Sequence, residues 1–216
     1  DTSMDNLGIL GVKADWQKVL DYMNPSEPDF QNAEPEINKP AIREFLNNLQ
    51  YPLYFLDYET MMGLVPYFDG QRPYQQVPFQ YSLHIIESHD GELRQTEYLH
   101  ERNSDPMKPL AEQLIKDIGT DGSVIVWNQS FEISRNREIG EAYPEIADAM
   151  QAINDRVVDL MIPFKQKLYS DERFGGSASI KNVLPVLVPK LSYKELGIQN
   201  GGTAQRASME AVLDGT

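Results

Sequence analysis

Apolar and polar positions follow different patterns in successive parts of this chain. Apolar residues recur at helical spacing in residues 1–23, which predicts a short helix. Three prolines among polar residues make residues 24–39 a predicted linker without regular structure. A second apolar stripe, in residues 40–49, predicts a helix that opens with proline. We therefore expect residues 1–39 to form an N-terminal helix and linker, and residues 40–216 to form the main domain.

The pattern changes to that of strands from residue 51 onward. Residues 53–56 are a continuous apolar run, which is typical of a strand covered on both faces. Residues 77–87 and 93–99 are two further predicted strands, and the Asp90-Gly91 pair between them favours a hairpin. The sheet is therefore expected to begin with three strands that run antiparallel.

Helices and strands alternate in the second half of the chain. The predicted elements are a helix from Asp105-Pro106 to Gly119, a strand at 124–127, a helix from about Ser130, a helix from Pro144, a strand at 156–160, and a short helix at 179–187 interrupted at Pro185. This order predicts an α/β fold with a mixed five-stranded sheet, the later strands parallel, and helices on both faces.

The amino-acid composition and charge exclude several classes of protein and of active site. The 216 residues contain no cysteine, which excludes a thiolate nucleophile and favours the cytoplasm. No apolar run approaches the roughly 20 residues of a membrane span. The net charge of −14 argues against a protein that coats nucleic acid. However, residues 51–160 hold 19 acidic and 8 basic groups, whereas residues 161–206 hold 3 and 7. An acidic centre beside a basic flank suits a cation-dependent phosphate enzyme, although solvated faces give the same statistic.

Two carboxylates lie at the end of the first buried strand, directly after its apolar run. Asp57 and Glu59 are two residues apart, so on a strand they face the same way, roughly 6.6 Å apart. Such a pair can share metal ions. The alternative is that the strand has simply reached solvent. Ligands of open α/β sheets bind where buried strands end, which favours the first interpretation here.

Glu132 and Asp159 follow two later strands. Glu132 has an alternative role in a first helical turn capped by Ser130, where the helix dipole favours an acid. Asp159 has an alternative role as the cap of a helix from Met161. If these acids share one edge of the sheet with Asp57, their mutual repulsion implies bound cations.

These segments, taken in order, resemble the DEDD-type 3′-to-5′ exonucleases, which have the RNase H-like fold. The resemblance rests on Tyr54-Phe55-Leu56-Asp57-Tyr58-Glu59, on Asn128 to Glu132, and on Val158-Asp159-Leu160. More narrowly, residues 51–206 look like an uncharacterised bacterial branch of that superfamily. Its features include Pro73 to Gln80, Gly176 to Lys181 with Val183-Leu184-Pro185, Leu191-Ser192-Tyr193 and Ile198 to Gly201.

The resemblance implies a nuclease that uses two Mg²⁺ or Mn²⁺ ions held by four acids. By position, Asp57 would bridge both ions, Glu59 would bind the ion on the nucleophile's side, and Glu132 would act in the second motif, where many members have Asp. Asp159 would be a further metal ligand. The family's last acid, with its Tyr or His, is expected in a helix beyond Thr216.

The resemblance also gives the basic flank a role in binding single-stranded or frayed DNA or RNA ends. Lys181 lies one turn into a helix capped by Ser179, where a phosphate would meet both charge and backbone N–H groups. Asn128 and Tyr74 are further candidate substrate contacts, Tyr74 by stacking on bases. The other basic residues of the flank are Lys165, Lys167, Arg173 and Lys190. No membrane partner is expected, and the resemblance leaves room for further nuclease or helicase domains in a longer chain.

Three functions therefore remain open at this point. The first is a metal-dependent exonuclease. The second is a catalytically inactive RNase H-like module that binds nucleic acid or protein, and the third is a phosphatase or nucleotidase on the same scaffold. The sequence contains no Gly-x-Ser-x-Gly elbow, phosphate-binding loop or Gly-x-Gly-x-x-Gly motif, which sets other common chemistries aside.

Overall fold

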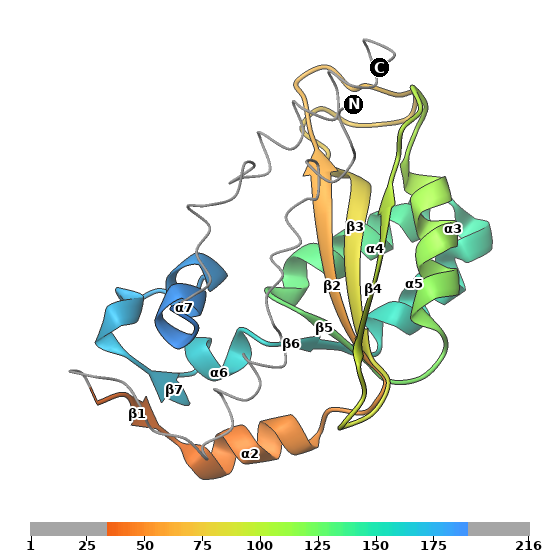
Figure 1. Cartoon of the computed structure of the whole chain (residues 1–216). Coiled ribbons are helices and arrows are strands. Elements are labelled where there is room, and N and C mark those ends of the chain that lie inside the picture. Colours follow the sequence, from red (N-terminus) through yellow and green to blue (C-terminus); the bar gives the residue numbers. More distant parts are fainter. Residues whose placement is uncertain (1–33, 190–216) are drawn as a thin grey trace, which may run out of the picture.

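A five-stranded mixed sheet organises the part of the chain that the computed structural model describes, residues 34–189 (Figure 1). Across the sheet the strands are ordered β4-β3-β2-β5-β6. Their bounds are β2 Leu53–Met61, β3 Val77–Ile86, β4 Leu93–Leu99, β5 Ser123–Val126 and β6 Val157–Asp159.

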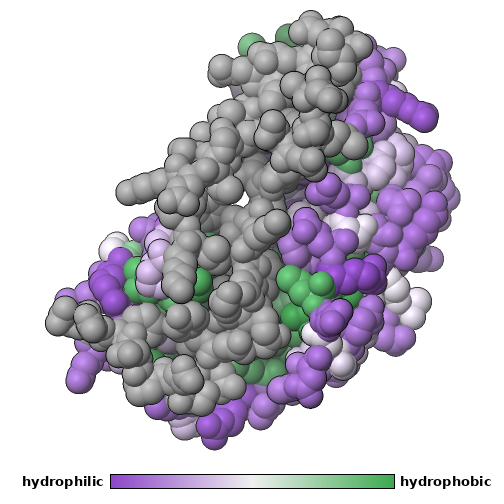
Figure 2. All heavy atoms as spheres, in the orientation of Figure 1, coloured by the Kyte–Doolittle hydropathy of each residue, from purple (hydrophilic) through white to green (hydrophobic). Residues whose placement is uncertain are grey.

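The strand directions confirm the predicted mixed sheet. β2, β3 and β4 pair antiparallel, whereas β5 pairs parallel with both β2 and β6. β2 is central and its first four residues are buried, as expected for a strand that helices cover on both sides. β4 is one of the two edge strands and is largely exposed, and Figure 2 shows a hydrophilic surface on this side of the molecule.

Helices cover both faces of the sheet, with one apolar core on each. The first face is covered by α3 Met107–Ile118, α4 Gln129–Ala142 and α5 Ala147–Asn154, which pack on alternate β2 residues such as Tyr54 and Leu56. The second face is covered by α2 Lys39–Asn47, α6 Ile162–Lys165 and α7 Ile180–Leu187, which pack around Leu53 and Phe55. This division follows from the period of two in a strand, which sends neighbouring side chains to opposite faces.

A second, two-stranded sheet lies outside the main one. β1 Glu36–Ile37 pairs antiparallel with β7 Tyr169–Ser170. The prediction that residues 24–39 hold no regular element is therefore wrong at its end. The pairing joins segments more than 130 residues apart, which local composition does not encode. The predicted helix in residues 1–23 lies outside the described residues.

β2 continues to Met61, so Asp57 and Glu59 lie on the second half of the strand, as their spacing predicts. Two local predictions need correction. α4 begins at Gln129 with Asn128 as its N-cap, so Ser130 is not the cap. α7 continues through Pro185 because Val183, Leu184 and Leu187 are buried against the second core, which outweighs the one backbone bond that proline removes.

The helices within residues 34–189 are all too short or too polar to cross a membrane.

Candidate metal centre

Asp57 and Glu59 are positioned by the second half of β2. They pair in register with Ser82 and Gln80 of β3. On the other side of β2, pairing with β5 covers only Leu53 to Phe55, because β5 ends at Val126. The second half of β2 thus extends beyond its parallel neighbour, and both carboxyls lie on the side of the sheet that faces α7.

Glu132 is delivered by the first turn of α4, directly after β5. Asn128 adopts a left-handed conformation (φ 79°) and turns the chain from the strand into the helix. Its backbone N–H donates to Asp159 Oδ1 at 2.9 Å, which fixes the start of α4 to the end of β6. The Glu132 side chain is only 3% exposed, and its Oε2 has no hydrogen-bond partner. A buried carboxylate oxygen without a partner is costly unless something else neutralises it.

The carboxyls interact electrostatically, which places them near one another. Burial raises the pKa of Glu132 to about 9, and repulsion from Asp57 and from Asp159 adds to the shift. Burial and repulsion from Asp57 raise the pKa of Glu59 to about 8, against the attraction of Lys181. The Asp57 side chain reaches solvent, yet surrounding protein reduces its hydration and raises its pKa to about 6. All three shifts disfavour the charged form, so the protein supplies too little positive charge for these acids.

Tyr58 ties β2 to α4 from the opposite face of the sheet. Its hydroxyl donates to Asn136 Oδ1 at 2.7 Å in the buried core. Asn136 Nδ2 in turn donates to Asn154 Oδ1 of α5 at 2.8 Å. Asn136 lies one helical turn after Glu132, and Tyr58 lies between Asp57 and Glu59, so this chain of bonds sets the position of α4 relative to β2.

Asp159 anchors two turns through one carboxylate oxygen. Its Oδ1 accepts the backbone N–H groups of both Asn128 and Met161, each at 2.9 Å. The bond to Met161 closes the turn that leads into α6, but the N-cap of α6 is Met161 itself, so Asp159 is not the helix cap that one alternative held. It also lies close enough to Glu132 to raise the pKa of that group.

The structure distributes the predicted substrate contacts around the acids. Lys181 lies in the first turn of α7 and interacts with Glu59. Ser179 is the N-cap of that helix, but its hydroxyl makes no capping bond. Asn128 acts through its backbone, as described above. Tyr74 is exposed in the loop between β2 and β3.

One member of the predicted basic flank has another role. Arg173 is paired with Asp171 through two side-chain N–H groups, so its charge is largely used within the fold. Lys165 is the last residue of α6, and Lys167 lies two residues after it. Lys190 lies outside the described residues.

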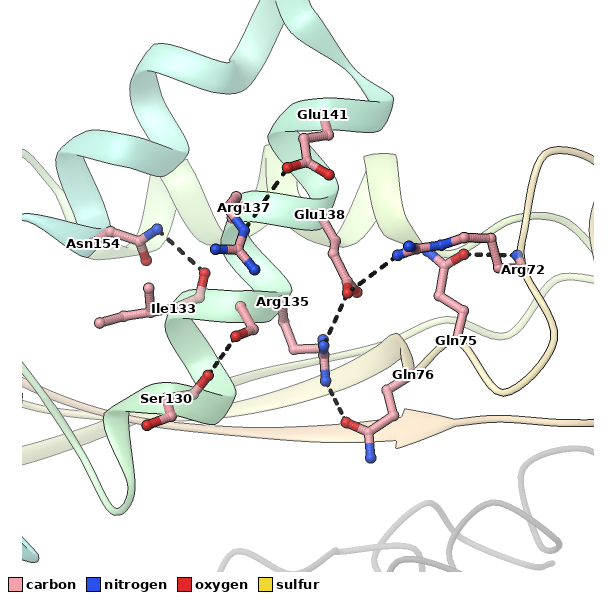
Figure 3. A network of polar contacts seen from close by, with 11 residues as sticks. Arg72, Gln75, Gln76, Ser130, Ile133, Arg135, Arg137, Glu138, Glu141 and Asn154 are labelled. Carbon is pink, nitrogen blue, oxygen red and sulfur yellow. Dashed lines mark hydrogen bonds and ion pairs between the residues drawn. The ribbon is translucent and has the colours of Figure 1, made fainter.

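A polar network on α4 was missed by the sequence analysis (Figure 3). Arg135 donates to Gln76, at the end of the β2–β3 loop, and to Glu138 at 3.1 Å. Glu138 also accepts from Arg72 of the same loop at 3.5 Å. The available signal was the spacing of Arg135 and Glu138, three residues apart on one helix face, but nothing local indicated the partner Gln76.

The donor set suits a hard divalent cation. Its members are all carboxylate oxygens, which Mg²⁺ and Mn²⁺ prefer, and the unpartnered Oε2 of Glu132 is the kind of atom that such a cation satisfies. Among residues 34–189, no three His, Cys, Asp or Glu side chains already stand in an arrangement that would hold a metal ion.

Comparison with known proteins identifies a family. Residues 54–179, more than half of the chain, match the family described as domain of unknown function DUF2779, and the chain belongs to this family. It is also 25% identical over 198 residues to the uncharacterized protein UU173 of Ureaplasma parvum serovar 3. The match covers 82% of this chain but 28% of that relative, so the chain spans less than a third of its length. No solved structure matches.

Proposed function

We propose that this member of the DUF2779 family is a metal-dependent nuclease that hydrolyses phosphodiester bonds. The observation that carries the proposal is the set of coupled acids around Glu132. This side chain is buried, lacks a partner for one oxygen, and interacts with Asp57 and Asp159. Asp57 also interacts with Glu59. Three acids that the fold leaves without enough positive charge, Asp57, Glu59 and Glu132, are suited to gain it from divalent cations.

In this proposal each residue has a distinct part. Asp57 is the central ligand because it interacts with both Glu59 and Glu132, and these two carboxylates complete the site from either side. Asp159 fixes the turn that delivers Glu132. Lys181, near Glu59, attracts the substrate's phosphate to the same edge. Two bound Mg²⁺ or Mn²⁺ ions would supply an activated water and stabilise the leaving oxygen.

We further infer the RNase H-like fold and 3′-to-5′ exonuclease polarity. The fold inference is supported by three antiparallel strands followed by two parallel ones, in the order β4-β3-β2-β5-β6. The polarity rests on the resemblance of Asp57, Glu59 and Glu132 to the first two motifs of DEDD-type exonucleases.

The test is cleavage of single-stranded oligonucleotides labelled at the 5′ or the 3′ end, with Mg²⁺ or Mn²⁺. The intact chain should shorten strands labelled at the 5′ end stepwise. Asp57→Asn should lower the rate on the order of 10²- to 10³-fold or more, because it removes a carboxylate charge from the centre of the site. Asp90→Asn, at the exposed β3–β4 turn, is the matched control and should leave the rate unchanged. No cleavage of DNA or RNA with either cation would overturn the proposal.

A second candidate is a catalytically inactive module that binds nucleic acid or protein. Two observations favour it: Asp159 Oδ1 is already engaged by two backbone N–H groups, and the acids of residues 34–189 form no ready-made metal cluster. This candidate predicts oligonucleotide or protein binding without cleavage, and equal binding with and without Mn²⁺.

A further inference from the structure

The loop between β2 and β3, residues 62–76, exposes apolar side chains directly beyond the strand that carries Glu59. Leu64 is 65% exposed, Val65 75% and Tyr74 63%. The loop holds one acidic residue, Asp69, and one basic residue, Arg72, so it is formally neutral in a chain of net charge −14. The loop therefore adds nothing to the chain's net negative charge that would repel a phosphate.

The loop is nevertheless held in a defined conformation. The Tyr74 backbone N–H donates to the Gly63 carbonyl at 2.8 Å and closes the loop across its base. Phe68 and Gln71 form a turn within it, and Phe68 packs against the first core. Because the loop is ordered, its apolar side chains are exposed by the fold and not by local fraying.

The backbone of Tyr74 is in an unfavourable conformation. Its φ is 59°, in the left-handed region that aromatic residues rarely adopt. Packing of the ring does not offset this strain, since the ring is mostly exposed. Strained residues held in place by their surroundings concentrate at ligand sites, which makes the ring a candidate for contact with a ligand.

The loop is also fastened to the helix that carries Glu132. Arg135 of α4 reaches Gln76 at one end of the loop, and Arg72 reaches Glu138 of α4 (Figure 3). Arg135 and Glu138 bond to each other at 3.1 Å. About 13 Å of β2 separates Asp57 from the start of the loop, from four residues at roughly 3.3 Å each. The Tyr74 ring and the acids therefore belong to one rigid unit.

We propose that Tyr74 is a stacking platform for an unpaired base of a single-stranded nucleic acid whose end lies at the acids. This deepens the proposed function and rests on it for the placement of the strand end. A neutral loop with an exposed ring favours contact with a base over contact with the phosphate chain, because stacking needs no positive charge. An apolar protein partner is the alternative occupant, and the test below separates the two.

The experiment measures the affinity of fluorescein-labelled oligonucleotides for the full chain in the Asp57→Asn background, where the probe stays intact. Tyr74→Ala should weaken single-strand binding about 5- to 100-fold, whereas Tyr74→Phe should change it less than about twofold. His89→Ala, which removes a ring that is 86% exposed at the β3–β4 turn, is the control and should have no effect. An abasic strand, which keeps the phosphates and lacks bases, should bind equally to all variants.

Tyr74→Gly guards against a trivial loss of fold. Glycine relieves the left-handed strain, so this variant should melt at the same temperature as the parent or a few degrees higher. It should still lose single-strand affinity as Tyr74→Ala does. If Tyr74→Gly gains stability and loses binding, the backbone strain at Tyr74 serves ligand binding and not folding.

Two results would overturn the inference: unchanged single-strand affinity in Tyr74→Ala, which leaves the loop to a protein partner, or an equal loss for the abasic strand. Its failure can be told from that of the proposed function. If the parent chain cleaves nothing but Tyr74→Ala weakens binding, the stacking contact stands, whereas the nuclease and the placement of the strand end at the acids do not. If the parent cleaves and Tyr74→Ala binds normally, the reverse holds.

Discussion

Two buried carboxylates in this protein are treated in opposite ways. Asp171, before the short turn that leads to α7, is surrounded by donors: its oxygens accept the Arg173 backbone N–H at 2.9 Å and two guanidinium N–H groups. These bonds hold its pKa below the usual value. Glu132 is equally buried but has an unpartnered oxygen and acidic neighbours, so its pKa is raised to about 9.

The difference separates a carboxylate that stabilises the fold from one that the fold tolerates. Asp171 carries its own counter-ion, so nothing further has to bind. Glu132 must take up a proton when the chain folds at neutral pH, which costs stability, and an acid at such a position is a candidate for a role in function. The contrast makes predictions of opposite sign for the two sites.

Removal of the built-in counter-ion should have the largest effect. Arg173→Met leaves Asp171 buried without its guanidinium partner and should lower the free energy of unfolding by about 2–4 kcal/mol. Urea denaturation at pH 7 measures the loss. Arg94→Met, which breaks an exposed pair with Glu87, should cost less than about 1 kcal/mol. Equal effects of the two variants would contradict the distinction drawn for Asp171.

Replacement of Glu132 by an amide that is neutral in both the folded and the unfolded chain should act in the other direction. Glu132→Gln should raise the free energy of unfolding by about 1–3 kcal/mol at pH 8 in the presence of a chelator. The folded-state pKa of Glu132 is raised, so its stabilising contribution is complete below the unfolded pKa near 4.5 and is lost as pH rises towards about 9. The gain should therefore vanish near pH 4.

Glu97→Gln, an exposed acid on β4, is the matched control for this variant and should stay within about 0.5 kcal/mol at either pH. If Glu132→Gln destabilises the protein at pH 8 without divalent cations, Glu132 is a structural acid like Asp171, and the comparison fails.

The scaffold behind the acids should affect both stability and cation affinity. Tyr58→Phe leaves Asn136 without its buried donor and should cost about 1–2 kcal/mol. Because this bond positions α4 beside β2, the variant should also weaken Mn²⁺ binding several-fold, measured by calorimetry. Tyr143→Phe, which removes a hydroxyl bonded to Asp105, is a control that should cost stability and leave Mn²⁺ affinity intact. Equal Mn²⁺ affinity in both variants would limit Tyr58 to a packing role.

The smallest effect expected is that of the cation on the parent chain. Mn²⁺ at ten times its Kd should stabilise the protein by about 1.4 kcal/mol. The rise in melting temperature should be larger at pH 8 than at pH 6, because the carboxyls of Glu59 and Glu132 must lose their protons before they bind a cation. An equal rise with Glu132→Gln would mean that Mn²⁺ binds elsewhere.

The sequence predicted the sheet well because its signals are local. The apolar run before Asp57, the Asp90-Gly91 hairpin and the position of Glu132 after a buried strand are each read within a few residues. The mixed sheet and the edge at which the acids meet follow from those signals and from the general rules of α/β folds.

What the sequence could not predict depends on long-range contacts. The bond between Tyr58 and Asn136 joins residues 78 apart, and that between Gln76 and Arg135 joins residues 59 apart. The continuation of α7 through Pro185 depends on a buried face that only the tertiary structure supplies. For the same reason, the sequence could not show that the Asp159 carboxylate accepts hydrogen bonds from both Asn128 and Met161. It therefore could not decide between this role and metal binding.

The most direct test of the account is a crystal of the full chain soaked with Mn²⁺ at pH 8, with anomalous scattering recorded to locate the ions. The account predicts density bounded by the carboxyls of Asp57, Glu59 and Glu132, and its loss in Asp57→Asn crystals treated in the same way. Anomalous density only elsewhere on the protein, with Glu132 Oε2 still unpartnered beside its neighbours, would contradict it.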